Sequence, residues 1–287
     1  MIHVEKYHGT GNDFIVVDAA LTVPDRRAFA TKYCDRETGI SQPDAEAIGA
    51  DGVLFLALEE QYSPPRVVMT LVQPDGSVAA MCGNGVRCAA AWAAEKTGSD
   101  ELMIDTLAGT RRATVGDDTV RVEMGQPSFD PDTVPITEES PLVEASVDEL
   151  TVTAVNTGVP HAVAFVEDVA AVDLQRVGPS VRNAPVFPEG ANVTIASRDT
   201  ERTDTVFEQR TFERGVEDET ASCGTGAVAV AAAARRLGRI DGNESVTVRP
   251  DGGTLEVTVS ADETTLSGPV TRSFATELPV TEPRRIS

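Results

Sequence analysis

The chain of 287 residues contains one local pattern twice, and this repeat constrains the fold more than any other feature. In "MCGNGVRCAAAWAAEK" (81–96) and "SCGTGAVAVAAAARR" (222–236), a cysteine precedes two closely spaced glycines and an alanine-rich run. The cysteines, Cys82 and Cys223, are 223 − 82 = 141 positions apart. Both runs are apolar almost all round, which predicts helices at 85–96 and 226–237 that are buried on every side. The repeat therefore predicts two equivalent halves, each with its own central helix.

A second match lies in the same register, because adding 141 to residues 49–51 of "IGADG" leads to residues 190–192 of "EGAN". Further helices are predicted at 25–34 and 173–183. Most other segments alternate β-branched and polar residues, which predicts strands. They are "FIVVDA", "VLFLAL", "RVVMTLV", "LTVTAV", "HAVAFV", "NVTIAS", "TVFEQRTF", "SVTVRP" and "TLEVTVS".

These elements predict an α+β fold of two pseudo-symmetric halves, in each of which strands wrap around a central buried helix. We expect residues 1–128 to form the N-terminal half and residues 129–273 the C-terminal half. The C-terminal tail, from about residue 274 to 287, is expected to pack back on the N-terminal half. The acidic, proline-bearing segment 126–150 would connect the halves.

The composition excludes several classes of function. A formal charge of −22, with acidic residues spread along the whole chain, leaves no basic patch for nucleic acid. The longest apolar run, 227–234, is far below the roughly 20 residues that cross a bilayer, and no signal-peptide pattern is present. We therefore expect a cytoplasmic protein without membrane contact that acts on a small molecule. The acidity also favours a protein that works at high salt, where screening reduces self-repulsion.

Neither a metal nor a cofactor is expected. The four cysteines form no C-x-x-C pair, and with only three histidines the chain lacks zinc-site spacing. Nucleotide-binding glycine motifs are missing, and three lysines offer few candidates for a Schiff-base cofactor.

Cys82 and Cys223 suit acid–base chemistry because each is expected at a helix N-terminus. The positive end of the helix dipole and the free N–H groups there lower a thiol pKa toward working pH. If the halves pack about a pseudo-twofold axis, the two sulfurs face opposite sides of one small ligand. A thiolate on one face and a thiol on the other could then invert an amino-acid α-carbon. Backbone N–H groups of "CGNG" and "CGTG" could bind the substrate carboxylate.

Other interpretations stay open for these residues. Cys34 and Cys88 are interpreted as packing residues. Cys82 and Cys223 could instead form a redox pair. His161 is either a core histidine or a functional one. Glu213 and Arg214 either form a local ion pair or bind the ammonium and carboxylate groups of an amino acid.

Over essentially the whole chain, the motifs resemble those of diaminopimelate epimerases. The motifs that carry the resemblance are "HGTGNDF" (8–14), "IGADG" (48–52), "PDGS" with "MCGNGVRC" (74–88), "TGVPH" (157–161), "EGAN" (189–192), "ERG" (213–215) and "ASCGTG" (221–226). The resemblance implies two β-rolls around central helices. It also implies interconversion of LL- and meso-diaminopimelate in lysine biosynthesis without cofactor or metal, and it is consistent with a homodimer.

Carried over to this chain, the resemblance makes Cys82 and Cys223 the proton-transfer pair. It implies that His161 and Glu213 tune the thiol pKa values. The implied substrate-binding residues are Asn12, Gln73, Gly83, Asn84, Asn192, Glu213, Arg214, Gly224 and Thr225.

Departures from the family pattern concern the distal end of the substrate. Gln73 stands where many members have asparagine, Val159 where many have another asparagine, and Gly52 where some have glutamine. The nearest alternative is a related cofactor-independent racemase of the proline or hydroxyproline type. An isomerase of the phenazine type would not need two thiols. Outside catalysis by proton transfer, the alternatives are a redox-sensing thiol protein and an acidic, non-catalytic binding protein.

Overall fold

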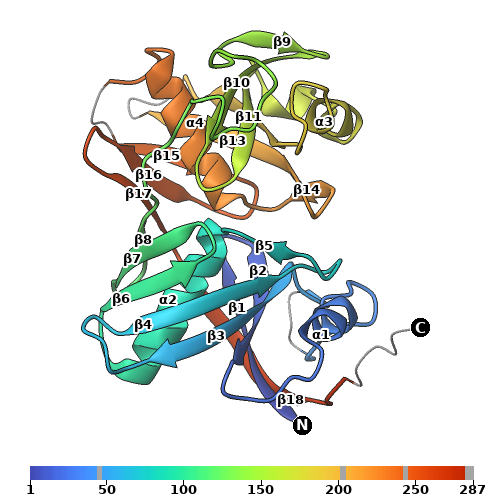
Figure 1. Ribbon diagram of the computed structural model, residues 1–287, viewed down its shortest axis with the longest axis vertical. Helices are drawn as coiled ribbons and strands as arrows, with labels where there is room; N and C mark the ends of the chain where they lie inside the picture. The colour runs from blue at the N-terminus through green and yellow to red at the C-terminus, as the bar shows by residue number, and fades with distance from the viewer. Residues whose placement is uncertain (44–46, 201–204, 242–244, 282–287) are drawn as a thin grey trace. The chain divides into compact units, whose positions relative to one another are not determined.

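The computed structural model describes residues 1–43, 47–200, 205–241 and 245–281 (Figure 1). The chain divides into two compact units, Met1–Val122 with Pro269–Ser287, and Glu123–Gly268. The borders expected from the sequence, after residues 128 and 273, lie a few residues further along the chain, and that division into domains stays a prediction.

In the N-terminal unit, seven strands follow one another in a fixed pairing order. They are β1 (Ile2–Gly9), β2 (Asn12–Asp18), β3 (Gly52–Glu59), β4 (Arg66–Val72), β6 (Glu101–Thr106), β7 (Gly109–Val115) and β8 (Val120–Glu123). β2 and β3 run parallel, as do β4 and β6, and the other neighbours are antiparallel. Short β5 (Val78–Ala79) pairs with β4, and β18 (Thr271–Leu278) returns to pair with β1.

The C-terminal unit repeats this order. Its corresponding strands are β10 (Leu150–Asn156), β11 (Pro160–Phe165), β12 (Asn192–Arg198), β13 (Val206–Glu213), β15 (Ser245–Arg249), β16 (Leu255–Val259) and β17 (Thr264–Gly268). β11 and β12 are parallel, as are β13 and β15, again with antiparallel neighbours between them. Short β14 (Asp218–Thr220) pairs with β13 as β5 does with β4, and β9 (Ala145–Val147) pairs with β10. The predicted α+β fold of two pseudo-symmetric halves is confirmed.

Each unit has a central helix enclosed by its strands. α2 (Gly83–Thr97) contacts strands β1 to β4, β6 and β7, and α4 (Gly224–Arg236) contacts strands β10 to β13 and β15 to β17. Every residue of α4 from Gly224 to Ala234 is buried, as the all-round apolar pattern predicts. Both helices begin two residues earlier than predicted, because a first helical turn tolerates glycines that would weaken a helix interior.

Two outer helices cover the opposite faces of the strands. α1 (Arg26–Tyr33) and α3 (Leu174–Arg182) are capped by Asp25 and Asp173, and the short 3-10 helix η1 (Val169–Ala171) precedes α3. Phe29 of α1 packs with Ile15 and Val17, whereas Phe14 and Val16 alternate onto the other face of β2. Because helices cover both faces, the central strands have near-continuous apolar sequences. No helix in the described residues combines the length and apolarity needed to cross a membrane.

Candidate functional site

Cys82 is the N-cap residue of α2. Its backbone is extended, with φ −149° and ψ 114°, and its Sγ accepts a hydrogen bond from the Gly85 N–H at 3.3 Å. A methyl group at Gly85 would lie 3.3 Å from Leu54 and 3.6 Å from the sulfur, so glycine allows this close approach. The sulfur therefore lies among the free N–H groups of a helix N-terminus, where a thiolate is stabilised.

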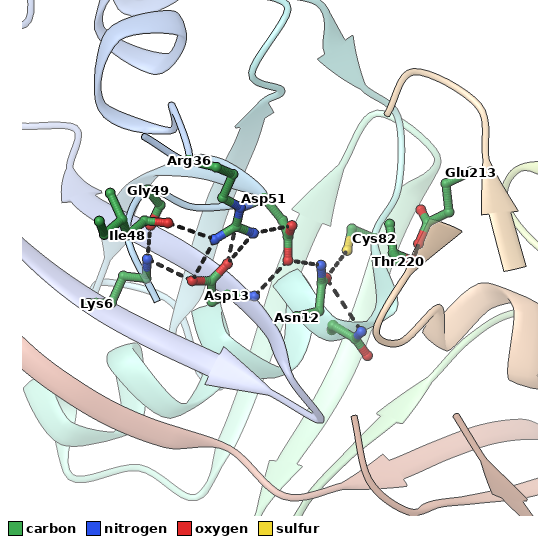
Figure 2. A network of polar contacts seen from close by, with 11 residues as sticks. Lys6, Asn12, Asp13, Arg36, Ile48, Gly49, Asp51, Cys82, Glu213 and Thr220 are labelled. Atoms are coloured by element: carbon green, nitrogen blue, oxygen red, sulfur yellow. Dashed lines mark hydrogen bonds and ion pairs between the residues drawn. The ribbon is translucent and has the colours of Figure 1, made fainter. Parts of the chain in front are cut away.

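Asn12 joins Cys82 to a polar network in the N-terminal unit (Figure 2). The Asn12 Oδ1 atom lies 3.8 Å from the Cys82 sulfur and accepts a hydrogen bond from Asn84 Nδ2 at 3.4 Å. On its other side, the Asn12 amide nitrogen donates to the carboxylate of Asp51. Because a carboxylate can only accept here, the Asn12 oxygen must face the thiol.

The network continues into a charge-balanced cluster of Lys6, Asp13, Arg36 and Asp51, in which Lys6 and Asp13 are buried and Arg36 is about half exposed. Asp13 forms ion pairs with Lys6 at 2.7 Å and with Arg36 at 2.9 Å, and Arg36 also pairs with Asp51. Burial opposes ionisation of Asp13, but hydrogen bonds from Arg36 and the charge of Lys6 lower its pKa overall. Burial raises the pKa of Asp51, and the charge of Asp13 adds to that effect. The two carboxylates and two cations of this cluster thus form the polar surroundings on the amide-nitrogen side of Asn12, which the Asp51 carboxylate contacts directly.

Two further residues expected at the site, Gly83 and Gln73, lie outside this polar network. Gly83 is the first residue of α2. Gln73 lies in the turn after β4, where its Oε1 accepts from the Ser77 hydroxyl at 2.9 Å. The structure thus brings Asn12, Asn84 and Cys82 together, whereas the contacts of the Gln73 side chain are within its own turn.

Cys223 occupies the equivalent position in the C-terminal unit as the N-cap residue of α4, with φ −122° and ψ 104°. Unlike Cys82, its side chain does not cap the helix, and Sγ lies 3.4 Å from Thr225 Oγ1. Only 5% of Cys223 is exposed. The two sulfurs thus share a backbone position but have different polar neighbours.

A ring of hydrogen bonds leads from the Cys223 sulfur back to its own carbonyl oxygen. Thr225 Oγ1 lies 3.0 Å from His161 Nε2, and His161 Nδ1 lies 3.1 Å from Thr194 Oγ1. Thr194 Oγ1 lies 3.1 Å from Thr211 Oγ1, which accepts from Gln209 Nε2 at 3.0 Å. Gln209 Nε2 also donates to Cys223 O at 3.2 Å, which closes the ring.

His161 is wholly buried and electrically neutral. Burial, with a smaller contribution from the charge of Arg214, lowers its pKa to about 3. Its Nε2 atom lies 3.0 Å from Thr225 Oγ1, which in turn lies 3.4 Å from the Cys223 sulfur. The Thr225 hydroxyl therefore links the imidazole to the sulfur.

Asn192, Arg214 and Glu213 lie beside this ring. The Arg214 backbone N–H donates to Asn192 Oδ1 at 2.8 Å, and Asn192 Nδ2 lies 3.4 Å from His161 Nε2. The Arg214 guanidinium donates to the carbonyl oxygens of Glu189 and Gly190. The Glu213 carboxylate accepts a hydrogen bond from the Thr220 hydroxyl, whereas the Arg214 side chain contacts backbone carbonyl oxygens.

The other two cysteines are core residues, as predicted. Cys34 is 1% and Cys88 0% exposed, and burial raises the pKa of each thiol to about 12. At neutral pH both are protonated and packed, which makes them poor nucleophiles.

The sequence alone assigns roles to Asn12, His161, Asn192 and Thr225, but not to the residues behind them, which are Lys6, Asp13, Arg36, Asp51, Thr194, Thr211 and Gln209. Asp13 and Asp51 lie within the motifs "HGTGNDF" and "IGADG", and the position of Asp13 directly after Asn12 was a usable signal. Thr194, Thr211 and Gln209 lie in ordinary strand sequences, and only the register of β12 and β13 brings them together.

Comparison with known proteins identifies the family of this chain. A family model described as diaminopimelate epimerase matches residues 4–129 and 153–273. The chain belongs to the diaminopimelate epimerase family. It is therefore an isomerase, as predicted from the sequence.

Relatives in this family match nearly the whole chain. The diaminopimelate epimerase of Methanothrix thermoacetophila is 42% identical over 274 residues, covering 92% of this chain and 91% of the relative. That of Methanocella arvoryzae is 42% identical over 291 residues, covering 97% of each. The crystal structure of a probable proline racemase from Agrobacterium radiobacter has a TM-score of 0.69 at 17% identity, with 98% of this chain and 94% of that chain covered. At that identity the likeness shows a shared fold.

Proposed function

We propose that this chain interconverts LL-2,6-diaminopimelate and meso-diaminopimelate, a reaction of lysine biosynthesis, by proton transfer between Cys82, Cys223 and the substrate α-carbon. The observation that carries the proposal is that each thiol is the N-cap of the buried central helix of its unit. Two equivalent thiols on a duplicated scaffold match the need of an inversion for one base and one acid.

In the proposed reaction, one cysteine as thiolate removes the α-proton and the other as thiol returns a proton to the opposite face. The developing negative charge spreads into the α-carboxylate, which needs hydrogen-bond donors fixed in advance. Backbone N–H groups in the first turns of α2 and α4, at Gly83 and Asn84 and at Gly224 and Thr225, are proposed for this role, because a first helical turn lacks intrahelical acceptors. The reaction uses neither a cofactor nor a metal ion, since proton carriers and anion-binding groups both belong to the chain.

Polar side chains around the thiols are assigned to the rest of the substrate. Asn12, Asn192, Glu213 and Arg214 are proposed to bind its ammonium and carboxylate groups. The proposal is supported by the contact of Asn12 with Cys82 and by that of Asn192 with His161, which lies beside Thr225. Gln73 is proposed to contact the distal amino-acid end, where its longer reach replaces an asparagine. The hydrophobic Val159 offers this end only backbone or apolar contact.

The experiment that tests the proposal follows the α-proton of LL-diaminopimelate by NMR in D₂O. We expect exchange with inversion at one centre, and we expect Cys82→Ser and Cys223→Ser each to lower kcat by about 10²–10⁴-fold, the usual contribution of a positioned acid or base. Cys34→Ala is the matched control, because it also removes one thiol but at a cysteine that lies in the core next to α1. We expect it to leave kcat unchanged.

Two results would contradict the proposal. Full turnover by both serine variants would exclude the two-thiol mechanism. Turnover of proline or hydroxyproline, with none of LL-diaminopimelate, would assign the chain to the other racemase class.

The setting of the enzyme is also a proposal: a cytoplasmic homodimer that works at high salt. The formal charge of −22 supports the salt requirement, because screening reduces self-repulsion. The dimer rests on the family resemblance alone. Sedimentation measures the oligomeric state, and thermal unfolding at low and high KCl measures the salt requirement. A monomer would overturn the dimer, and equal stability at both salt concentrations would overturn the salt requirement.

A further inference from the structure

The hydrogen-bond ring around Cys223 has a definite direction, and one amide sets it. The Arg214 backbone N–H can only donate, so the side-chain atom of Asn192 that lies 2.8 Å from it is the carbonyl oxygen. The Asn192 amide nitrogen therefore faces His161 Nε2, at 3.4 Å. An amide nitrogen is a donor only, so Nε2 must be the acceptor of the imidazole.

A neutral imidazole carries one ring proton, which the acceptor role of Nε2 places on Nδ1. Nδ1 then donates to Thr194 Oγ1 at 3.1 Å, and Thr194 can donate onward to Thr211. Thr194 is 0% exposed, so no bulk water can replace its hydroxyl as the acceptor. Thr211 is fixed in turn by the amide of Gln209, which also holds the Cys223 carbonyl oxygen.

The same direction reaches the thiol through Thr225. The Thr225 hydroxyl has one hydrogen, and it points to Nε2 when Nε2 accepts. Its oxygen is then left to accept the S–H hydrogen of Cys223, 3.4 Å away. The arrangement holds Cys223 as a thiol whose hydrogen has a defined direction.

We propose that Asn192 and Thr194 hold His161 in the Nδ1–H tautomer, and that Thr225 thereby becomes a rotating hydroxyl that serves both protonation states of Cys223. This inference rests on the proposed function. When Cys223 gives its proton to the substrate carbanion, the S–H bond breaks, a C–H bond forms and a thiolate remains. The Thr225 hydroxyl turns to donate to that thiolate, while Asn192 continues to donate to Nε2. His161 exchanges no proton, and Thr194 is a positioning residue that touches neither substrate nor sulfur.

The tautomer can be measured directly by ¹⁵N NMR of the folded protein labelled at histidine. The chain has only three histidines, so His3→Gln and His8→Gln assign the signals of His161. We expect a protonated, pyrrole-type Nδ1 and an unprotonated, pyridine-type Nε2. The opposite pattern in the wild-type protein would overturn the proposal whatever the variants show.

Thr194→Val keeps the side-chain shape but removes the acceptor of the Nδ1–H group. We expect the Nε2–H tautomer to become populated and kcat to fall about tenfold, with KM unchanged. Thr194→Ser keeps the hydroxyl and should restore the wild-type spectrum and rate. Thr264→Val is the matched control, because Thr264 is also buried in the C-terminal unit and its hydroxyl has no hydrogen-bond partner among the described residues.

A Thr194→Val protein that retains both the Nδ1–H tautomer and the wild-type kcat would refute the positioning role. A wild-type protein with the expected tautomer but no activity on LL-diaminopimelate would refute the proposed function alone. The two failures are therefore distinguishable.

Discussion

The buried, neutral His161 predicts a specific loss of stability in mild acid. The folded state holds the His161 pKa at about 3, chiefly through burial, whereas an imidazole in the unfolded chain has a pKa of about 6.5. Between these two values the unfolded chain binds a proton that the folded chain does not. The contribution of His161 to stability is therefore fully present above pH 6.5 and is lost progressively as the pH falls toward 3.

The size of this effect follows from the distance to the unfolded pKa. At pH 5, about 1.5 pH units below that value, protonation of the unfolded chain lowers the free energy of unfolding by about 2 kcal/mol. No reduction for solvent screening applies, because the ring is wholly buried. His161→Gln removes the titrating group while keeping a polar side chain, so its stability should lack this contribution.

The assay is urea unfolding of both proteins at several pH values from 8 to 5 in the same salt. The glutamine variant will be less stable at pH 8 through lost packing, so the comparison is the change with pH. We expect the wild-type free energy of unfolding to fall by about 2 kcal/mol more than that of the variant. Equal changes in the two proteins would refute the conclusion that folding keeps His161 neutral.

Two further predictions concern the N-terminal unit. Asp13→Asn leaves the buried Lys6 without a full counter-charge and should lower the free energy of unfolding by about 3 kcal/mol in thermal or urea unfolding. Glu101→Gln, in a half-exposed ion pair, should cost less than about 0.5 kcal/mol, and equal costs would argue against a special contribution from the buried Lys6–Asp13 pair. Iodoacetamide should modify Cys82, the least buried thiol, before the other three cysteines, with substrate protecting it. Peptide mass spectrometry that finds a core cysteine modified first in the folded protein would contradict that order.

The sequence predicts the main architecture because the repeat involves residues whose chemistry is unusual for their position. A cysteine before two glycines and an apolar run indicates a helix N-terminus in both halves, and the structure differs only by two residues in where α2 and α4 begin. All nine segments predicted as strands are strands. Their signal has two sources: central strands such as β2 and β12 are buried on both faces and are therefore nearly continuously apolar, whereas β15 and β16 alternate buried and more exposed residues.

Strand β1 shows why other elements were not predicted. Its sequence, "IHVEKYHG", carries Glu5 and Lys6 side by side, which is typical of an exposed segment. In the structure both are buried, at 4% and 3% exposure, because Lys6 pairs with Asp13 and Glu5 with Arg272. Arg272 comes from β18, near the end of the chain, so no local pattern could reveal the pairing.

The candidate site shows the same limit at the level of side chains. The motifs identify both cysteines and Asn192, but they do not distinguish a threonine facing a histidine from one facing solvent. Thr194 and Thr211 are direct cross-strand partners in β12 and β13, so their contact follows once the register is known. The register depends on long-range pairing, which short sequence windows do not contain.

The repeat also shows where the two units have diverged. The register pairs Phe14 with Gly52 in one unit and Ala162 with Val193 in the other, so Asp13 corresponds to His161 and Asp51 to Asn192. At the same two positions, one unit has two aspartates paired with cations, and the other has a neutral imidazole and an amide. Asp13 has its pKa lowered and His161 has a pKa of about 3, so neither changes charge between pH 5 and 8. Each unit thus has a group of constant charge near its N-cap thiol: in one unit Asp13, whose charge is balanced by Lys6 and Arg36, and in the other the neutral His161. This difference can distinguish the two cysteines even though their backbone positions are equivalent.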